Sequence, residues 1–91
     1  MQYVQIIVEG KVQGVFFRKH TQQVAVKLGL NGFVRNSRDG SVYIEACGQE
    51  ENIKQFIEWC NHGPERAEVS TVKVEKIEPQ KYIHFEIRSS E

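Results

Sequence analysis

The sequence predicts an α+β fold, in which one antiparallel sheet has two helices packed on one face. Several short stretches alternate apolar and polar residues, which is typical of strands with one buried face. Two longer stretches repeat apolar residues at helical spacing. The order of these stretches interleaves the helices with the strands. Because 91 residues are enough for one small hydrophobic core, we expect residues 1–91 to form a single domain.

The first half of the chain predicts a strand, a helix and a hairpin. Residues 3–9 alternate as a strand does, and a glycine-containing loop follows them. Residues 17–29 have apolar side chains at helical spacing and end on a glycine, which is a common helix stop. Residues 32–36 and 41–48 are strand-like and are separated by Asp39-Gly40, a strong turn signal. Two strands joined this closely are expected to form a hairpin.

The second half predicts the other helix and the last strands. Residues 50–61 form the clearest helix, with one apolar stripe made of Ile53, Phe56, Ile57 and Cys60. Residues 68–79 are β-rich but depart from strict alternation, which indicates a bulge. Residues 83–88 alternate again as a short final strand. The order is therefore βαββαβ plus a short last strand, the ferredoxin-like arrangement. This fold occurs with many functions, so function must be argued from the site residues.

Composition limits the classes of function. Twelve Lys and Arg residues balance twelve Asp and Glu residues, which argues against a nucleic-acid binder. No apolar run approaches the length of a membrane span, and no signal pattern is visible at the N-terminus. We therefore expect no nucleic-acid or membrane partner and a cytoplasmic location, with Cys47 and Cys60 as reduced thiols. The two cysteines have no metal-ligand spacing to each other or to the histidines, so no metal site is predicted.

The stretch GKVQGVFFR, residues 10–18, is the first candidate site. Its two glycines allow the backbone to turn tightly and to approach a ligand closely. The helix that begins after it presents unpaired N–H groups and the positive end of its dipole, which favours an anion. Arg18 adds a planar charged group that suits phosphate. A plain glycine turn beside a surface arginine is the alternative.

Asn36 is the second candidate, because this topology can place the end of the second strand at the same sheet edge as the glycine loop. An arginine, loop N–H groups and one amide offer no evident nucleophile, carboxylate pair or metal cluster. They do suit attack of water on a phosphoryl group that already has a good leaving group, because positioning and charge stabilisation dominate that reaction. Asn36 would then orient the water.

Two motifs resemble the signatures of the acylphosphatase family. The stretch GKVQGVFFR is similar to the first, and GFVRN at 32–36, followed by Gly40, Val42 and Gly48, is similar to the second. The stretch KLGL at 27–30 and Gly63-Pro64 extend the likeness over nearly the whole chain.

This resemblance implies a monomeric hydrolase that cleaves small acyl phosphates to carboxylate and inorganic phosphate without a metal or cofactor. It implies that Arg18 is the essential arginine and that Asn36 positions the water. The backbone expected to hold the phosphate is that of Gln13, Gly14, Val15, Phe16, Phe17 and Arg18. Many family members have glycine at the position of Phe16, although others have a bulky residue there.

Several residues have simpler explanations beside the functional ones. Asn36 precedes a turn, where asparagine often forms a local backbone hydrogen bond. His20 is expected to be a polar residue of the first helical turn rather than an acid or base, and Thr21 to pack or cap. Lys11 and Lys19 either raise the local positive potential or are ordinary solvated charges. For Trp59 and Phe16 a partner surface is the alternative, and core packing or a partly exposed ring is the expectation.

Two other functions remain open from the sequence. A non-catalytic anion-binding or regulatory module on the same fold would bind phosphate without releasing it from a substrate. An RNA-binding sheet would need exposed aromatic residues on its central strands, for which Tyr3 and Tyr43 are candidates, and a basic surround that this composition lacks.

Overall fold

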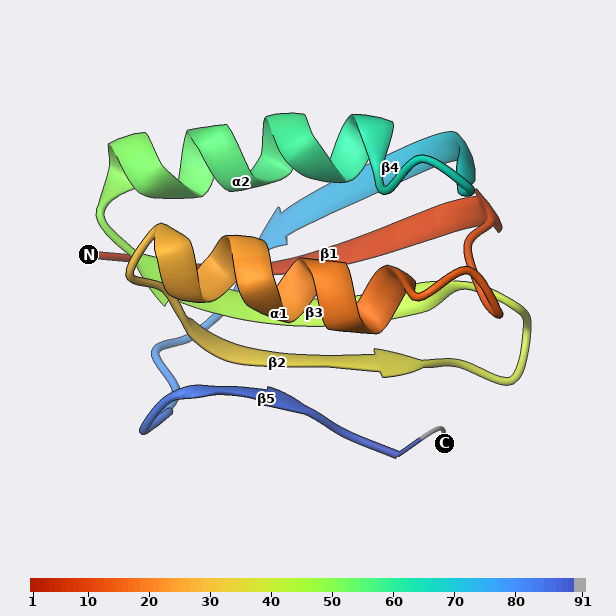
Figure 1. The fold of residues 1–91 in the computed structure, drawn as a ribbon. Helices are drawn as coiled ribbons and strands as arrows, with labels where there is room; N and C mark the ends of the chain where they lie inside the picture. Colours follow the sequence, from red (N-terminus) through yellow and green to blue (C-terminus); the bar gives the residue numbers. More distant parts are fainter. Residues whose placement is uncertain (90–91) are drawn as a thin grey trace.

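The chain folds into a five-stranded sheet with both helices on one face, as Figure 1 shows for this computed structural model. The structure describes residues 1–89, so residues 90–91 of the expected domain lie outside the described part. The elements in chain order are β1 Gln2–Lys11, α1 Phe17–Lys27, β2 Asn31–Asn36, β3 Val42–Gly48, α2 Glu50–His62, β4 Glu68–Lys76 and β5 Phe85–Ile87. The predicted βαββαβ order with a short last strand is confirmed.

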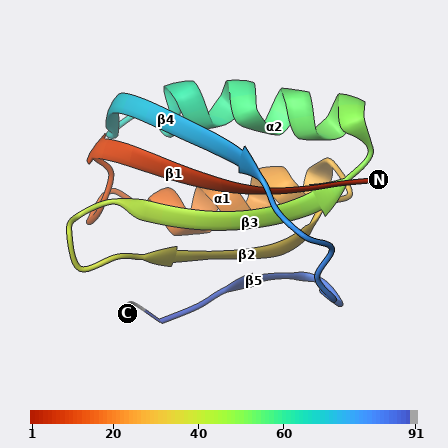
Figure 2. The same ribbon diagram turned by 180° about the vertical axis from the view of Figure 1, so that it is seen from behind.

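The sheet order is β4-β1-β3-β2-β5, and all pairings are antiparallel except that of β2 with β5, which is parallel. The prediction of a wholly antiparallel sheet is therefore wrong for the last strand. The reason is the connection after β4, which crosses the helix-free face and delivers β5 to the opposite edge (Figure 2). Tyr82 anchors this connection, because its hydroxyl donates to Glu45 and its ring lies 6.4 Å from that of Phe33.

Two details of the last strands depend on local packing. The register between β1 and β4 shifts at Glu9/Gly10, so the expected bulge is present, and Ser70 has no partner in the pairing. The last strand begins at Phe85 rather than at residue 83. Phe85 is buried in the core, whereas Ile83 is 84% exposed in the crossing connection. Alternation alone therefore predicted a strand two residues too long at its start.

The core lies between the helices and the inner face of the sheet. On α2 the buried residues are Ile53, Phe56 and Cys60, which confirms most of the predicted apolar stripe. Trp59 packs beside Phe17 with ring centroids 5.5 Å apart. Burial raises the pKa of the free Cys60 thiol, which disfavours its reactive thiolate form. No helix within residues 1–89 is long and apolar enough to cross a membrane.

Candidate active site

The loop between β1 and α1 forms one wall of the candidate site. Gly14 has φ 74°, and Phe16 has φ 61° at the residue just before α1. Phe16 is the sole non-glycine residue with positive φ within residues 1–89. In the same described part of the chain, the backbone N–H groups of residues 13–18 donate to no protein acceptor. These free donors, at the positive end of a helix dipole, can bind an anion.

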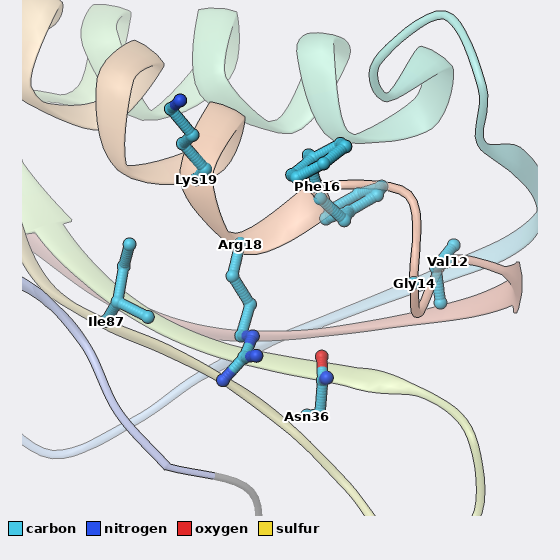
Figure 3. Close-up of a pocket in the computed structure, with 8 residues that line it drawn as sticks. Val12, Gly14, Phe16, Arg18, Lys19, Asn36 and Ile87 are labelled. Atoms are coloured by element: carbon cyan, nitrogen blue, oxygen red, sulfur yellow. The ribbon is translucent and has the colours of Figure 1, made fainter.

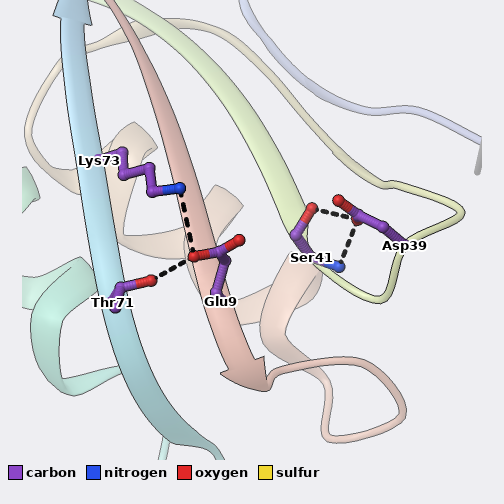
Figure 4. Close-up of polar contacts among 5 residues, drawn as sticks. All are labelled: Glu9, Asp39, Ser41, Thr71 and Lys73. Carbon is purple, nitrogen blue, oxygen red and sulfur yellow. Dashed lines mark hydrogen bonds and ion pairs between the residues drawn. The ribbon is translucent and has the colours of Figure 1, made fainter.

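The side chain of Gln13 fixes this loop to the β2–β3 hairpin. Its Nε2 donates to the carbonyl oxygens of Ser37 and Ser41, both at 2.8 Å. Asp39 closes the hairpin, because one carboxylate oxygen accepts from the N–H and the hydroxyl of Ser41 at 2.9 and 2.6 Å (Figure 4). The hydroxyl bond, followed by the N–H bond, holds the pKa of Asp39 below its ordinary value. The loop is thus tied to the hairpin that follows β2.

Arg18 lies in the first turn of α1, and its side chain extends toward Asn36 (Figure 3). Its Nη1 donates to the carbonyl oxygen of Arg88 at 3.0 Å. A guanidinium has five N–H donors in a fixed plane, so this bond orients the group and leaves other donors for a ligand. The residue after β5 therefore helps to aim the candidate phosphate-binding arginine.

Asn36 is the last residue of β2, and its side chain points to the loop side of the site (Figure 3). Its Oδ1 is buried and has no hydrogen-bond partner among the described residues. Buried polar atoms are nearly always paired, so an unpaired one indicates a position that a ligand or a water completes. The local backbone hydrogen bond considered from the sequence is not made by this oxygen. A half-turn of the amide exchanges Oδ1 and Nδ2, so either atom can face a ligand.

These elements enclose a cavity of about 340 Å³. Its lining residues are Val12, Gly14, Phe16, Phe17, Arg18, Lys19, Asn36 and Ile87. The two residues predicted from separate motifs, Arg18 and Asn36, therefore lie on one cavity. Of the predicted loop, Gln13 and Val15 do not line it: Gln13 binds the hairpin, and Val15 is buried in the core.

The neighbouring charged and polar residues divide between the site and the protein surface. Lys19 lines the cavity, but its ammonium points away from Arg18 (Figure 3). His20 lies outside the lining, and its Nδ1 is 2.9 Å from the carbonyl oxygen of Phe16. Thr21 is buried, and its hydroxyl donates to the carbonyl of Phe17 at 2.7 Å, so it packs as expected. Within residues 1–89, no group of three His, Cys, Asp or Glu side chains could hold a metal ion.

Ile87 and the carbonyl of Arg88 also belong to the site, although the sequence motifs do not predict them. Arg88 is 70 residues from Arg18 along the chain, and a backbone carbonyl has no sequence signature. The motif that resembles the first signature therefore predicts the loop and the arginine but not the residue after β5 that orients the arginine.

On the helix-free face of the sheet, the ring of Tyr43 is covered by another side chain of the protein. Tyr43 lies on this face, and the guanidinium carbon of Arg35 lies 4.4 Å from its ring centroid. Its hydroxyl donates to Glu45 at 2.7 Å, and burial followed by this bond raises the pKa of Tyr43 to about 12. The ring is thus already covered by a protein cation, which disfavours base stacking of the kind that RNA-binding sheets use.

Comparisons with known proteins show the family of this chain. The acylphosphatase family model matches residues 4–87. The chain is 44% identical over 80 residues to an acylphosphatase from Colwellia psychrerythraea, covering 88% of this chain and 90% of that protein. Its fold is similar to an acylphosphatase from Coxiella burnetii (TM-score 0.93, 40% identity, 96% and 92% coverage) and to one from Bacillus subtilis (TM-score 0.93, 36% identity, 97% and 99% coverage). The chain belongs to the acylphosphatase family.

Proposed function

We propose that this chain is an acylphosphatase that hydrolyses small acyl phosphates, with Arg18 binding the phosphate and Asn36 placing the attacking water. Water forms a new P–O bond, the P–O bond to the acyl oxygen breaks, and the products are a carboxylate and inorganic phosphate. Family membership supports the activity. One observation supports these residue roles: Arg18 and Asn36 line the same cavity, and the amide oxygen of Asn36 has no partner among the described residues.

The phosphoryl group would bind between Arg18 and the free N–H groups of the loop. Hydrogen bonds between charged donors and phosphate oxygens are about twice as strong as neutral ones. Negative charge remains on the phosphoryl oxygens throughout the loose transition state of this reaction. Donors that are fixed in advance stabilise that charge without having to reorganise. Gln13 and Arg88 fix the loop and the guanidinium in this way.

Asn36 would orient the attacking water through its amide. The oxygen accepts a hydrogen bond from the water, and the amide N–H₂ can donate to the water or to a phosphoryl oxygen. The water is thereby held close to phosphorus, and such positioning supplies a large part of many catalytic effects. A substrate phosphate oxygen can take the proton from the water. The carboxylate leaves without protonation, so the reaction needs no separate acid and gives His20 no role.

Two substitutions test these roles with benzoyl phosphate as substrate. We expect Arg18→Gln to lower kcat/KM by roughly a thousandfold or more, because an arginine on a transferring phosphoryl group contributes on this scale. We expect Asn36→Ala to lower kcat by about a hundredfold or more while inorganic phosphate still binds. Arg66→Gln and Asn61→Ala, exposed positions away from the cavity, are matched controls. Parent-like turnover by both site variants would refute the assigned roles.

The same assay separates this function from a non-catalytic anion-binding module. Such a module would bind acyl phosphate but would release no inorganic phosphate from it. We further propose that the enzyme works as a monomer in the cytoplasm, without nucleic-acid partners. The cavity lining from one chain supports the first point, and the free thiols of Cys47 and Cys60 support a reducing compartment. Light scattering at working concentration tests the monomer.

A further inference from the structure

Phe16 is an exposed aromatic side chain at the mouth of the cavity. It is 63% exposed, and the next apolar lining residue, Ile87, is 42% exposed. Among residues 1–89 these are the two large, exposed apolar side chains that line the cavity. The ring of Phe16 therefore adds little to the core, and its accessible surface borders the space that a substrate would enter.

The backbone conformation at Phe16 disfavours a bulky side chain. Its φ of 61° lies in the left-handed region, where glycine and asparagine are favoured and a bulky residue is strained. A glycine would meet the needs of the loop backbone at this position without strain. Neither packing in the core nor backbone geometry therefore accounts for a phenyl ring here, whereas its place on the cavity lining fits contact with a ligand.

The direction of the reaction places the acyl group near this ring. In phosphoryl transfer the attacking and leaving oxygens are roughly in line with phosphorus. Asn36, the proposed water-positioning residue, lies on the β2 side of the cavity, whereas Phe16 lies at the start of α1 (Figure 3). Water that attacks from the β2 side therefore expels the carboxylate toward the α1 side. The acyl group of the substrate would lie there, against the phenyl ring.

We propose that Phe16 is a specificity-determining residue that contacts the acyl group and favours aromatic or bulky apolar acyl phosphates over acetyl phosphate. This inference rests on the proposed function. An aromatic acyl group gains ring–ring contact with Phe16, and aromatic pairs contribute beyond the area that they bury. Acetyl phosphate has one methyl group and gains little from the same contact. Phosphate binding does not use the ring, so the inference concerns selectivity rather than the catalytic step.

The test is the ratio of kcat/KM for benzoyl phosphate to kcat/KM for acetyl phosphate. We expect Phe16→Asn and Phe16→Gly each to lower this ratio by roughly fivefold to tenfold, because both remove the ring. Phe16→Tyr keeps the ring and should keep the ratio within about twofold. Val26→Ser is the matched control, because Val26 is an exposed apolar residue of α1 outside the cavity lining, and its ratio should not change.

The outcomes distinguish this inference from the proposed function. If the parent protein hydrolyses neither substrate, the proposed function fails, and the inference fails with it. If the parent hydrolyses both substrates and the kcat/KM ratio of Phe16→Asn and Phe16→Gly equals that of the parent, only the role of Phe16 is overturned. Equal losses on both substrates would show that the position acts through the loop backbone and would also overturn it. Inhibition by inorganic phosphate is measured on every variant. It shows, independently of turnover, whether the loop still binds phosphate.

Discussion

Replacing Asn36 by alanine should remove turnover and yet leave the fold as stable as before, or more stable. The buried Oδ1 has no hydrogen-bond partner, and an unpaired buried polar group destabilises a fold by about 1–3 kcal/mol. Alanine removes that penalty but also loses packing of a half-buried side chain, which costs about 1 kcal/mol. The net change in the free energy of unfolding is then about 0 to 2 kcal/mol in favour of the variant.

Urea and thermal denaturation measure the change in stability, and benzoyl phosphate hydrolysis measures the change in kcat, on the same samples. For a domain of this size, a gain of 1 kcal/mol raises Tm by about 4–8 °C. Asn61→Ala is the matched control, because the Asn61 amide donates to the carbonyl of Ile57 at 2.9 Å on the exposed face of α2. Its removal should lower stability slightly and leave kcat unchanged.

A loss of more than about 1 kcal/mol in Asn36→Ala would refute this reasoning, since a net hydrogen bond contributes about that amount. It would show that the amide forms a structural hydrogen bond in the free protein, as asparagine before a turn often does. Asn36→Asp adds a further check. A carboxylate at this place would repel phosphate, so inorganic phosphate should bind the aspartate variant more weakly than the alanine variant.

Three further perturbations follow from the loop and the sheet. Gln13→Ala removes both hydrogen bonds between the loop and the hairpin, and we expect unfolding in urea to show a loss of about 1–3 kcal/mol, with a raised KM. Phe16→Gly relieves a left-handed backbone strain of about 1–2 kcal/mol but adds unfolded-state entropy, so the fold should gain up to about 1 kcal/mol. The raised pKa of Tyr43 stabilises the fold fully below pH 10, and this contribution is lost as pH rises toward about 12. The urea midpoint should therefore fall with pH less steeply in Tyr43→Phe than in the parent between pH 9 and 11.

Each of these has a contradicting result. A Gln13→Ala variant with parental stability and KM would mean that the loop holds its shape without the hairpin. A Phe16→Gly variant less stable than the parent would mean that the exposed ring packs more than it is strained. Equal pH slopes in the parent and Tyr43→Phe would mean that the phenol does not prefer its neutral form in the folded state.

The elements with regular periodicity could be predicted from the sequence. The apolar stripe of α2 and the alternation of β1 and β3 arise from the burial of one face, and burial also decides where those elements pack. Arg18 and Asn36 could be named because each belongs to a short local motif. Their meeting in one cavity follows from the βαββαβ topology, which places the first loop and the end of β2 at one edge.

Other features could not be predicted, because they depend on contacts between distant parts of the chain. The parallel pairing of β5 requires the connection after β4 to cross the sheet, and Tyr82 secures that crossing through Glu45. The alternating pattern wrongly placed the start of the last strand at Ile83, because alternation does not show which residues pair with a neighbouring strand. The left-handed backbone at Phe16 could not be predicted either, because phenylalanine rarely adopts this conformation and nothing in the sequence marks the exception.

The hydrogen bond from Arg18 to Arg88 has a consequence for biosynthesis. The two residues are 70 positions apart, so at ribosomal rates Arg18 is made roughly 4–14 seconds before Arg88. During that interval a nascent chain can contain the loop, α1 and β2 while its arginine still lacks the Arg88 carbonyl that orients it. If Arg18 binds the phosphate as proposed, full activity therefore requires that the residue after β5 has already folded into place. Chains that end before Arg88 should then hydrolyse acyl phosphate more slowly than the full chain, even where their secondary structure has formed.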